Sequence, residues 1–143
     1  MSVDRNTAMR LWKDVFGNNI WGQDCFGSWM HRDDYGDKEK LRVGPSGLGR
    51  PYNYGWDVDH IRPVTDFNIE QAAHFMNNYE PMHHANNERK SNYYPHFAIG
   101  RERYMIIKCG ICNAHDVPGY GILKVSSDKR VDWKGVKNKY YQR

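Results

Sequence analysis

Apolar residues near the start of the chain recur at the spacing of a helix. Between residues 7 and 16 they would form one buried face, and Gly17 with the two asparagines after it would end the helix. Asp4, Asn6 and Thr7 are all residue types that cap a helix N-terminus, and any of them could do so here. The pattern predicts an N-terminal helix over about residues 7–16.

The spacing then changes from a helical period to the alternation of a strand. Residues 54–59 alternate between apolar and polar side chains until Pro63 interrupts them. A second strand is indicated at residues 80–83, and a helix at residues 85–93, before a proline that would stop it. A short helix over residues 68–75 would cover the connection. The middle of the chain thus predicts a strand–strand–helix unit.

The remaining segments complete an α+β fold. Strands are predicted at residues 104–108 and 120–125, then a turn, and then a returning strand at residues 130–133. Residues 21–36 are rich in glycine and aromatic side chains. Three apolar side chains of this segment are expected in the core: Phe26, Trp29 and Met30. We therefore expect an N-terminal helix, a central strand–strand–helix unit and a C-terminal antiparallel β extension.

Composition narrows the class of protein without deciding it. The 143 residues suit a single domain over residues 1–143, and an aromatic content of 14% argues against disorder. The net charge of +4 fits a polyanionic partner and equally an ordinary solvated surface. With no apolar stretch of about 18 residues, no membrane partner is expected. The start of the chain does not resemble a secretory signal and the three cysteines form no disulfide framework, so a cytoplasmic location is expected.

Chemically informative residues gather around the predicted strand–strand–helix unit. Asp59 ends the first strand, and its carboxylate is a ligand type that a hard divalent cation prefers; Asn87 could add an amide oxygen. Because adjacent residues of a strand point to opposite faces, His60 would be left to deprotonate a water molecule. A carbonyl acceptor from Asn78 could hold the ring of His60 and set its tautomer.

These residues lie in a segment that resembles the HNH endonuclease motif. Asp59-His60 is followed by Asn78 and then by Asn87, which opens an Asn-x-x-Lys sequence over residues 87–90. The flanking sequences are similar to the bacterial branch of that family: Trp56-x-x-Asp59-His60-Ile61-x-Pro63, Pro81-Met82-His83, and the upstream Phe26-Gly27-Ser28-Trp29-Met30 with Tyr35-Gly36. The resemblance covers residues 21–93, roughly half of the chain.

The resemblance implies a ββα-metal core and a role for each residue of the motif. Asp59 and Asn87 would bind a single Mg²⁺ or Mn²⁺ ion, and His60 would be the general base. Asn78 would orient His60. His83 would lie next to the metal ligands without binding the metal itself. Because the last motif position is Asn87 and not a histidine, the chain would be a His-Asn-Asn variant.

The implied reaction is hydrolysis of DNA, with double-stranded DNA as the expected partner and 5′-phosphate ends as products. A single ββα site cuts one strand at a time, so clean double-strand cleavage would require a homodimer. Arg62, Arg89 and Lys90 are candidates for binding nucleic-acid phosphates, and each is equally explained as an ordinary surface charge.

Several assignments have alternatives in the sequence itself. His60 could be a core histidine bonded to Asp59. Asn77 and Asn86 are neighbours of the two motif asparagines and could replace them, and His84 could replace His83.

Two other functions compete with nuclease activity. One is a nucleic-acid-binding module of the same fold that has lost catalysis. The other is an interaction domain stabilised by zinc at Cys109, Cys112 and His115. A structural zinc site needs four ligands, and Cys25 or another histidine would have to supply the fourth, so two free thiols are favoured over zinc here.

Overall fold

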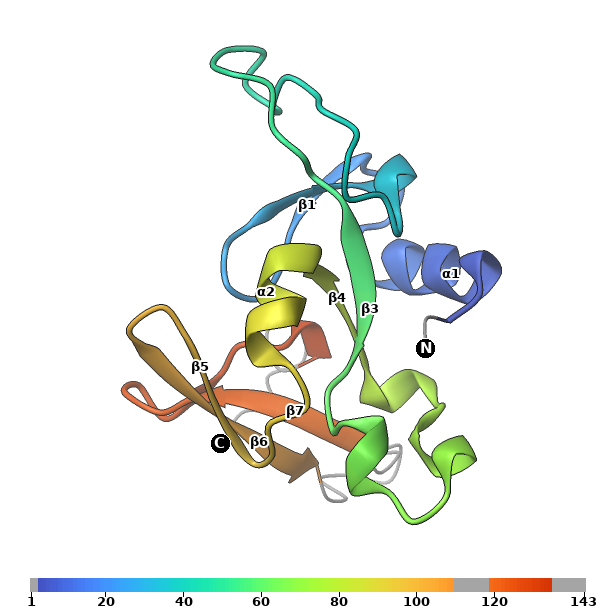
Figure 1. The fold of residues 1–143 in the computed structure, drawn as a ribbon, viewed down its shortest axis with the longest axis vertical. Coiled ribbons are helices and arrows are strands. Elements are labelled where there is room, and N and C mark those ends of the chain that lie inside the picture. Colours follow the sequence, from blue (N-terminus) through green and yellow to red (C-terminus); the bar gives the residue numbers. More distant parts are fainter. Residues whose placement is uncertain (1–2, 110–118, 135–143) are drawn as a thin grey trace. The chain divides into compact units, whose positions relative to one another are not determined.

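The computed structural model describes residues 3–109 and 119–134. The chain forms two compact units (Figure 1): Met1–Val58 with Pro81–Glu88, and Asp59–Glu80 with Arg89–Arg143. It mixes helices with antiparallel strands, which confirms the α+β class. In the part of the chain that is described, neither helix is long and apolar enough to cross a membrane.

The predicted N-terminal helix is confirmed and begins two residues earlier than expected. Helix α1 spans Arg5–Phe16, and of the three candidate caps it is Asp4 whose carboxylate accepts a hydrogen bond from the backbone N–H of Thr7, at 2.8 Å. Gly17 ends the helix with a φ of 64°, a left-handed conformation that favours glycine. The helix buries Trp12, whose ring lies 5.0 Å from that of Trp56.

Two short strands follow in the first unit. Strands β1 (Trp21–Gln23) and β2 (Trp29–His31) pair antiparallel. Met30 is fully buried, as expected, and Phe26 is half-buried. The prediction for Trp29 is wrong: its side chain is 40% exposed, because neighbouring residues of a strand point to opposite faces and Met30 occupies the inner one.

The predicted strand–strand–helix order is present in the middle of the chain. Strands β3 (Trp56–His60) and β4 (Tyr79–His83) pair with each other, and helix α2 (His84–Lys90) follows β4 directly. Helix α2 ends three residues earlier than expected, where Ser91 adopts a φ of 53°. The order of elements is that of a ββα unit.

The connection between β3 and β4 is not the predicted helix. It contains three short 3₁₀ turns: η2 (Val64–Asp66), η3 (Glu70–Ala73) and η4 (Met76–Asn78). Extended residues separate these turns, and side-chain amide hydrogens of Asn78 bond back to the carbonyls of Arg62 and Ala73. A continuous helix would remove the bend that brings these groups together.

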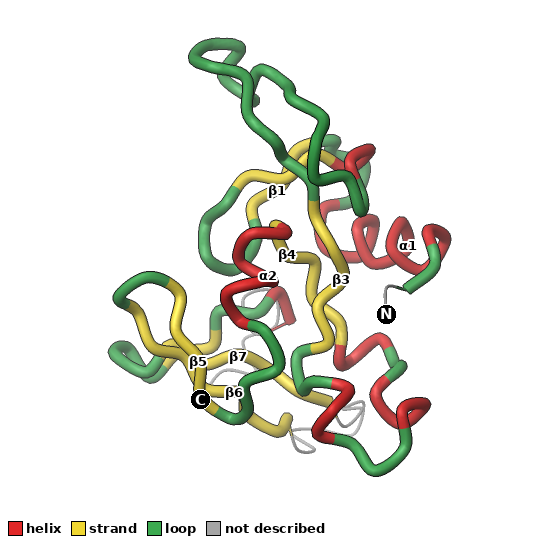
Figure 2. The backbone as a smooth tube through the Cα atoms, viewed as in Figure 1, coloured by secondary structure: helices red, strands yellow, loops and turns green. Residues whose placement is uncertain are grey.

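The second unit contains a four-stranded antiparallel sheet (Figure 2), in the order β5-β6-β7-β8. Its strands are β5 (His96–Ile99), β6 (Glu102–Cys109), β7 (Gly119–Lys124) and β8 (Lys129–Arg130). The C-terminal antiparallel extension is therefore confirmed, but the returning strand predicted over residues 130–133 is wrong in its bounds, since β8 covers only Lys129–Arg130. Strand β5 is an additional strand that the sequence pattern did not reveal.

Buried charged side chains lie in β8 and next to it. Arg130 pairs with Asp132 at 2.6 Å, and Asp132 also accepts the backbone N–H of Ile122. The carboxylate of Glu80 accepts the backbone N–H of Trp133 at 3.0 Å. Burial, reinforced by the negative charge of Asp132, raises the pKa of Glu80 well above its ordinary value.

Candidate active site

The last two residues of β3 carry the predicted chemistry. The carboxylate of Asp59 is only 4% exposed, and its Oδ1 lies 3.2 Å from the ammonium nitrogen of Lys90. Its other oxygen, Oδ2, is buried and has no hydrogen-bond partner among the described residues. Burial raises the pKa of Asp59, and the positive charge of Lys90 opposes that rise. This residue is therefore a buried acid with one unsatisfied oxygen.

Lys90, at the end of α2, is the partner of Asp59 and not a surface cation. Its side chain is fully buried, and its Nζ donates to the backbone carbonyls of His60 at 3.2 Å and Ile61 at 2.8 Å. A lysine without exposed surface cannot approach a phosphate, so the prediction that Lys90 binds nucleic acid is wrong. Lys90 instead links the end of α2 to the end of β3, through the carboxylate of Asp59 and the two backbone carbonyls.

His60 is half-buried, and its ring contacts two other rings. Its Nε2 lies 2.9 Å from Nδ1 of His74, within hydrogen-bond distance, and Tyr79 packs edge-on at 5.2 Å between ring centroids. Burial, followed by the charge of His74, lowers the pKa of His60 to about 4. Near neutral pH the imidazole is therefore uncharged, which is the form that can accept a proton.

Asn78 performs a structural task that differs from the predicted one. Its side-chain oxygen accepts the backbone N–H of Arg62 at 2.9 Å, and its amide hydrogens go to the carbonyls of Arg62 and Ala73. Its backbone carbonyl accepts the N–H of Ile61. The prediction that Asn78 holds the ring of His60 is therefore wrong: Asn78 fixes the chain after β3, and His74 contacts the ring.

His74 is the site residue that the sequence analysis missed. It follows turn η3, in the segment that was expected to be a short helix. Its Nε2 lies 3.6 Å from the carboxylate of Glu70, four residues earlier. The sequence does show a glutamate and a histidine four residues apart in this polar connection, which could have marked His74 as a candidate. Nothing in the sequence places the pair near His60.

Arg62 is held by several groups of the second unit. Its guanidinium bonds to the carboxylate of Asp66 and the hydroxyl of Tyr120, both at 2.6 Å, and lies over the ring of Phe67. These contacts join the segment between β3 and β4 to strand β7. Because they occupy the guanidinium, they do not support the predicted contact between Arg62 and a phosphate. Arg89 is exposed on α2, and its role in binding nucleic acid stays a prediction.

In the first unit, His83 is the last residue of β4 and directly precedes helix α2. It is buried, with Nδ1 accepting the backbone N–H of Ala85 at 3.1 Å and Nε2 lying 2.9 Å from the carbonyl of Asn53. Both ring nitrogens are therefore engaged with backbone groups. His84 stacks on this ring at 4.5 Å between centroids, and neither of its buried ring nitrogens has a partner among the described residues.

The two neighbouring asparagines of α2 differ sharply. Asn86 is buried, and its amide donates to the carboxylate of Asp24 at 2.9 Å and to the hydroxyl of Ser28 at 2.8 Å. Asn87 is half-buried, and its amide makes no hydrogen bond within the described residues. The amide of Asn87 is therefore not committed to a contact among the described residues, and its role as a metal ligand stays a prediction.

Asp24 organises this part of the first unit. Its Oδ1 accepts the backbone N–H groups of Phe26 and Ser28, and its Oδ2 accepts those of His83 and the amide of Asn86. Every lone-pair direction of this buried carboxylate therefore has a donor, which is the arrangement of a structural residue.

The proposed zinc ligands cannot be assembled from the described residues. Cys109 is buried at the end of β6, while Cys112 and His115 lie outside the described residues. Over residues 3–109 and 119–134, no three histidine, cysteine, aspartate or glutamate side chains gather as a metal-binding group.

Comparisons with protein-family models, with curated proteins and with solved structures found no match to this chain.

Proposed function

We propose that this chain is a metal-dependent endonuclease of the HNH type that hydrolyses phosphodiester bonds in DNA. The observation that carries the proposal is Oδ2 of Asp59, a buried carboxylate oxygen without a partner in the described chain, next to a neutral His60. Burying an unpartnered carboxylate oxygen costs free energy, and a ligand that needs an oxygen donor would recover that cost.

The donor chemistry at Asp59 suits a hard divalent cation such as Mg²⁺ or Mn²⁺. Carboxylate oxygen is the ligand type that these ions prefer, and Mg²⁺ keeps several water molecules, so few protein ligands are needed. When bound, the ion would supply charge stabilisation for the phosphate and the leaving oxygen. Asn87, the second ligand that the resemblance implies, stays a prediction from the sequence.

The residues of the second unit would perform the remaining tasks. His60 would accept a proton from the attacking water, because its lowered pKa keeps the ring neutral near pH 7. Lys90 would favour the ionised form of Asp59 and fix the backbone of His60 through its carbonyl. Asn78 would fix the backbone after β3 at Arg62, so that His60 and Asp59 keep their positions at the end of that strand.

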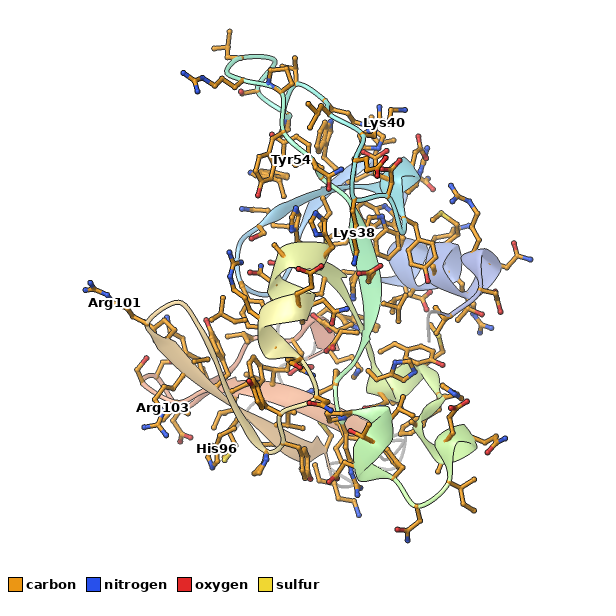
Figure 3. The ribbon with its side chains drawn as sticks, viewed as in Figure 1. Lys38, Lys40, Tyr54, His96, Arg101 and Arg103 are labelled. Atoms are coloured by element: carbon orange, nitrogen blue, oxygen red, sulfur yellow. The ribbon has the colours of Figure 1, made fainter. Side chains whose placement is uncertain are left out.

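Positive charge for the DNA backbone would come from side chains other than Lys90 and Arg62. Arg101 and Arg103 are exposed at the hairpin between β5 and β6, where Figure 3 shows them projecting from the second unit. Exposed arginines of this kind bind phosphates without reading sequence. They support a nucleic-acid partner only in combination with the site.

The direct test is cleavage of supercoiled plasmid DNA, with Mg²⁺, with Mn²⁺, or with a chelator. We expect the wild type to cut only with metal, and His60→Ala to lose a factor of about 10²–10⁴ in rate, the usual contribution of a general base. His96→Ala is the matched control, because His96 is an exposed histidine on β5 of the same unit (Figure 3) and should leave the rate unchanged.

Equal cleavage by the wild type and by His60→Ala would show that His60 is not the base. Metal-independent cleavage would contradict the role of Asp59. If the wild type and His60→Ala both bind DNA but neither cuts it, a nucleic-acid-binding module without catalytic activity would be favoured over a nuclease.

A further inference from the structure

Three ionisable side chains of the second unit lie in a row that ends at the proposed base. Glu70 Oε2 lies 3.6 Å from Nε2 of His74, and Nδ1 of His74 lies 2.9 Å from Nε2 of His60. All three belong to β3 or to the connection that follows it. The motif resemblance assigns no role to Glu70 or His74.

The contact between the two rings restricts where their protons can be. Only one of the two facing nitrogens can carry a hydrogen when both rings are neutral, because the other must accept it. If His60 donates from Nε2, its Nδ1 keeps a lone pair and is able to take a proton from water. If His74 donates from Nδ1 instead, His60 carries its hydrogen on Nδ1 and cannot act as a base through that nitrogen.

Glu70 favours one of these two arrangements. A neutral histidine that accepts at Nδ1 carries its hydrogen on Nε2, which in His74 is the nitrogen nearest the carboxylate of Glu70. The opposite arrangement would aim a lone pair at that negative charge. At 3.6 Å the carboxylate is too far for a good hydrogen bond, so it acts through its charge, and it is partly exposed, so the effect is modest.

We propose that His74, biased by Glu70, is a positioning residue that keeps His60 in the tautomer with its hydrogen on Nε2 and its basic lone pair on Nδ1. This inference rests on the proposed function for its catalytic consequence. The pairing itself rests on the geometry of the second unit. His74 thus takes the orienting role that the sequence analysis assigned to Asn78.

Nitrogen-15 NMR of histidine side chains tests the pairing without any substrate. Long-range ¹H–¹⁵N spectra of the full chain, at a pH where both rings are neutral, should show His60 and His74 with hydrogen on Nε2 and none on Nδ1. In His74→Phe, which keeps a ring but removes the acceptor, the signals of His60 should move toward a mixture of tautomers. In His74→Asn, whose side-chain oxygen can replace Nδ1 as an acceptor, they should return toward the wild-type pattern.

Plasmid cleavage tests the consequence on the same variants. His74→Phe should lower kcat roughly tenfold to a hundredfold, the usual cost of losing a residue that orients a functional histidine, with little change in KM. His74→Asn should recover part of that loss. Glu70→Gln, which removes only the charge, should have a smaller effect in the same direction. The exposed His96, changed to Phe, is the matched control and should alter neither the signals of His60 nor kcat.

A wild-type spectrum with hydrogen on Nδ1 of His60 would overturn the inference, and so would a His60 signal that His74→Phe leaves unchanged. A wild-type protein with the expected spectrum but no metal-dependent cleavage would reject the proposed function and the catalytic role of His74, while the pairing would stand.

Discussion

Asp24 in the first unit and Asp59 in the second are both buried, but their carboxylates are bonded very differently. Each oxygen of Asp24 accepts two hydrogen bonds from neighbouring backbone or amide groups. In Asp59, Oδ1 pairs with Lys90, and Oδ2 has no partner within the described residues. The two side chains are almost equally inaccessible, at 6% and 4% exposed, so burial alone does not distinguish them.

The difference separates a structural acid from a candidate ligand. A carboxylate whose lone pairs are all used stabilises the fold and has nothing to offer a metal ion or substrate. A carboxylate that is buried with one oxygen unused is costly unless another group binds it. The comparison therefore predicts that changes at Asp24 act on stability, whereas changes at Asp59 act on ligand binding.

The largest effect is expected from removing the partner of Asp59. Lys90→Met leaves a buried carboxylate without its counter-ion, and we expect it to lower the free energy of unfolding by about 3–5 kcal/mol. Without Lys90 the pKa of Asp59 should rise further, so the folded state holds its proton more tightly than the unfolded state. The loss should therefore be small at acid pH and grow as pH increases.

Urea denaturation at several pH values measures this effect, and the exposed Lys38→Met is a suitable control. The double variant with Asp59→Asn should recover part of the lost stability, because no charge is then left buried. A loss that does not depend on pH would show that Lys90 acts mainly through its carbonyl contacts.

A somewhat smaller loss of stability is expected at Asp24. Asp24→Asn places an amide NH₂ where the carboxylate accepted hydrogen bonds, so two donors of the first unit would lose their acceptor. At about 1–2 kcal/mol for each unsatisfied donor, the free energy of unfolding should fall by about 2–4 kcal/mol.

Cleavage per folded molecule should remain at the wild-type level in Asp24→Asn, measured at a temperature where the variant is folded. Asp33→Asn, at a largely exposed aspartate, is the control for the charge change. A folded Asp24→Asn protein without activity would break the distinction between the two aspartates.

The smallest effect concerns Glu80, a third buried carboxylate. Its raised pKa means that the folded state holds a proton that the unfolded state has released, so stability should fall as pH rises above the ordinary glutamate range and through the raised pKa. The expected slope is about 1.4 kcal/mol per pH unit. Glu80→Gln keeps an acceptor for Trp133 and should flatten this slope in urea denaturation; an unchanged slope would assign the pH dependence to another group.

Local patterns in the sequence predicted the elements better than the contacts between them. The stop at Gly17 and the strands β3, β4, β6 and β7 follow from spacing and from residue types that act on their immediate neighbours, and Asp4 is one of the three caps that the sequence left open. The connection after β3 was wrongly expected to be helical, because its turns depend on bonds to the side chain of Asn78. Strand β5 is short, and only its pairing with β6 makes it a strand.

The candidate site was predictable as a set of residues but not as a set of contacts. The motif resemblance singled out Asp59, His60 and Asn87 by their order. It did not reveal that Lys90 turns inward onto Asp59, or that His74 meets His60, because both contacts depend on how the chain folds back over 14 to 31 positions. Partners at such separations leave no periodic signal in one sequence.

Binding of Mn²⁺ without DNA tests the central claim, that Asp59 carries the unused ligand oxygen, most directly. The free-ion signal in electron paramagnetic resonance gives the affinity of the wild type, of Asp59→Asn, and of Asp57→Asn as a control on the same strand. The wild type and Asp57→Asn should bind one ion with similar affinity, and Asp59→Asn should bind at least about tenfold more weakly, because it loses the carboxylate charge that a hard cation prefers. Equal binding by Asp59→Asn and the wild type, or no binding by the wild type, would contradict the account.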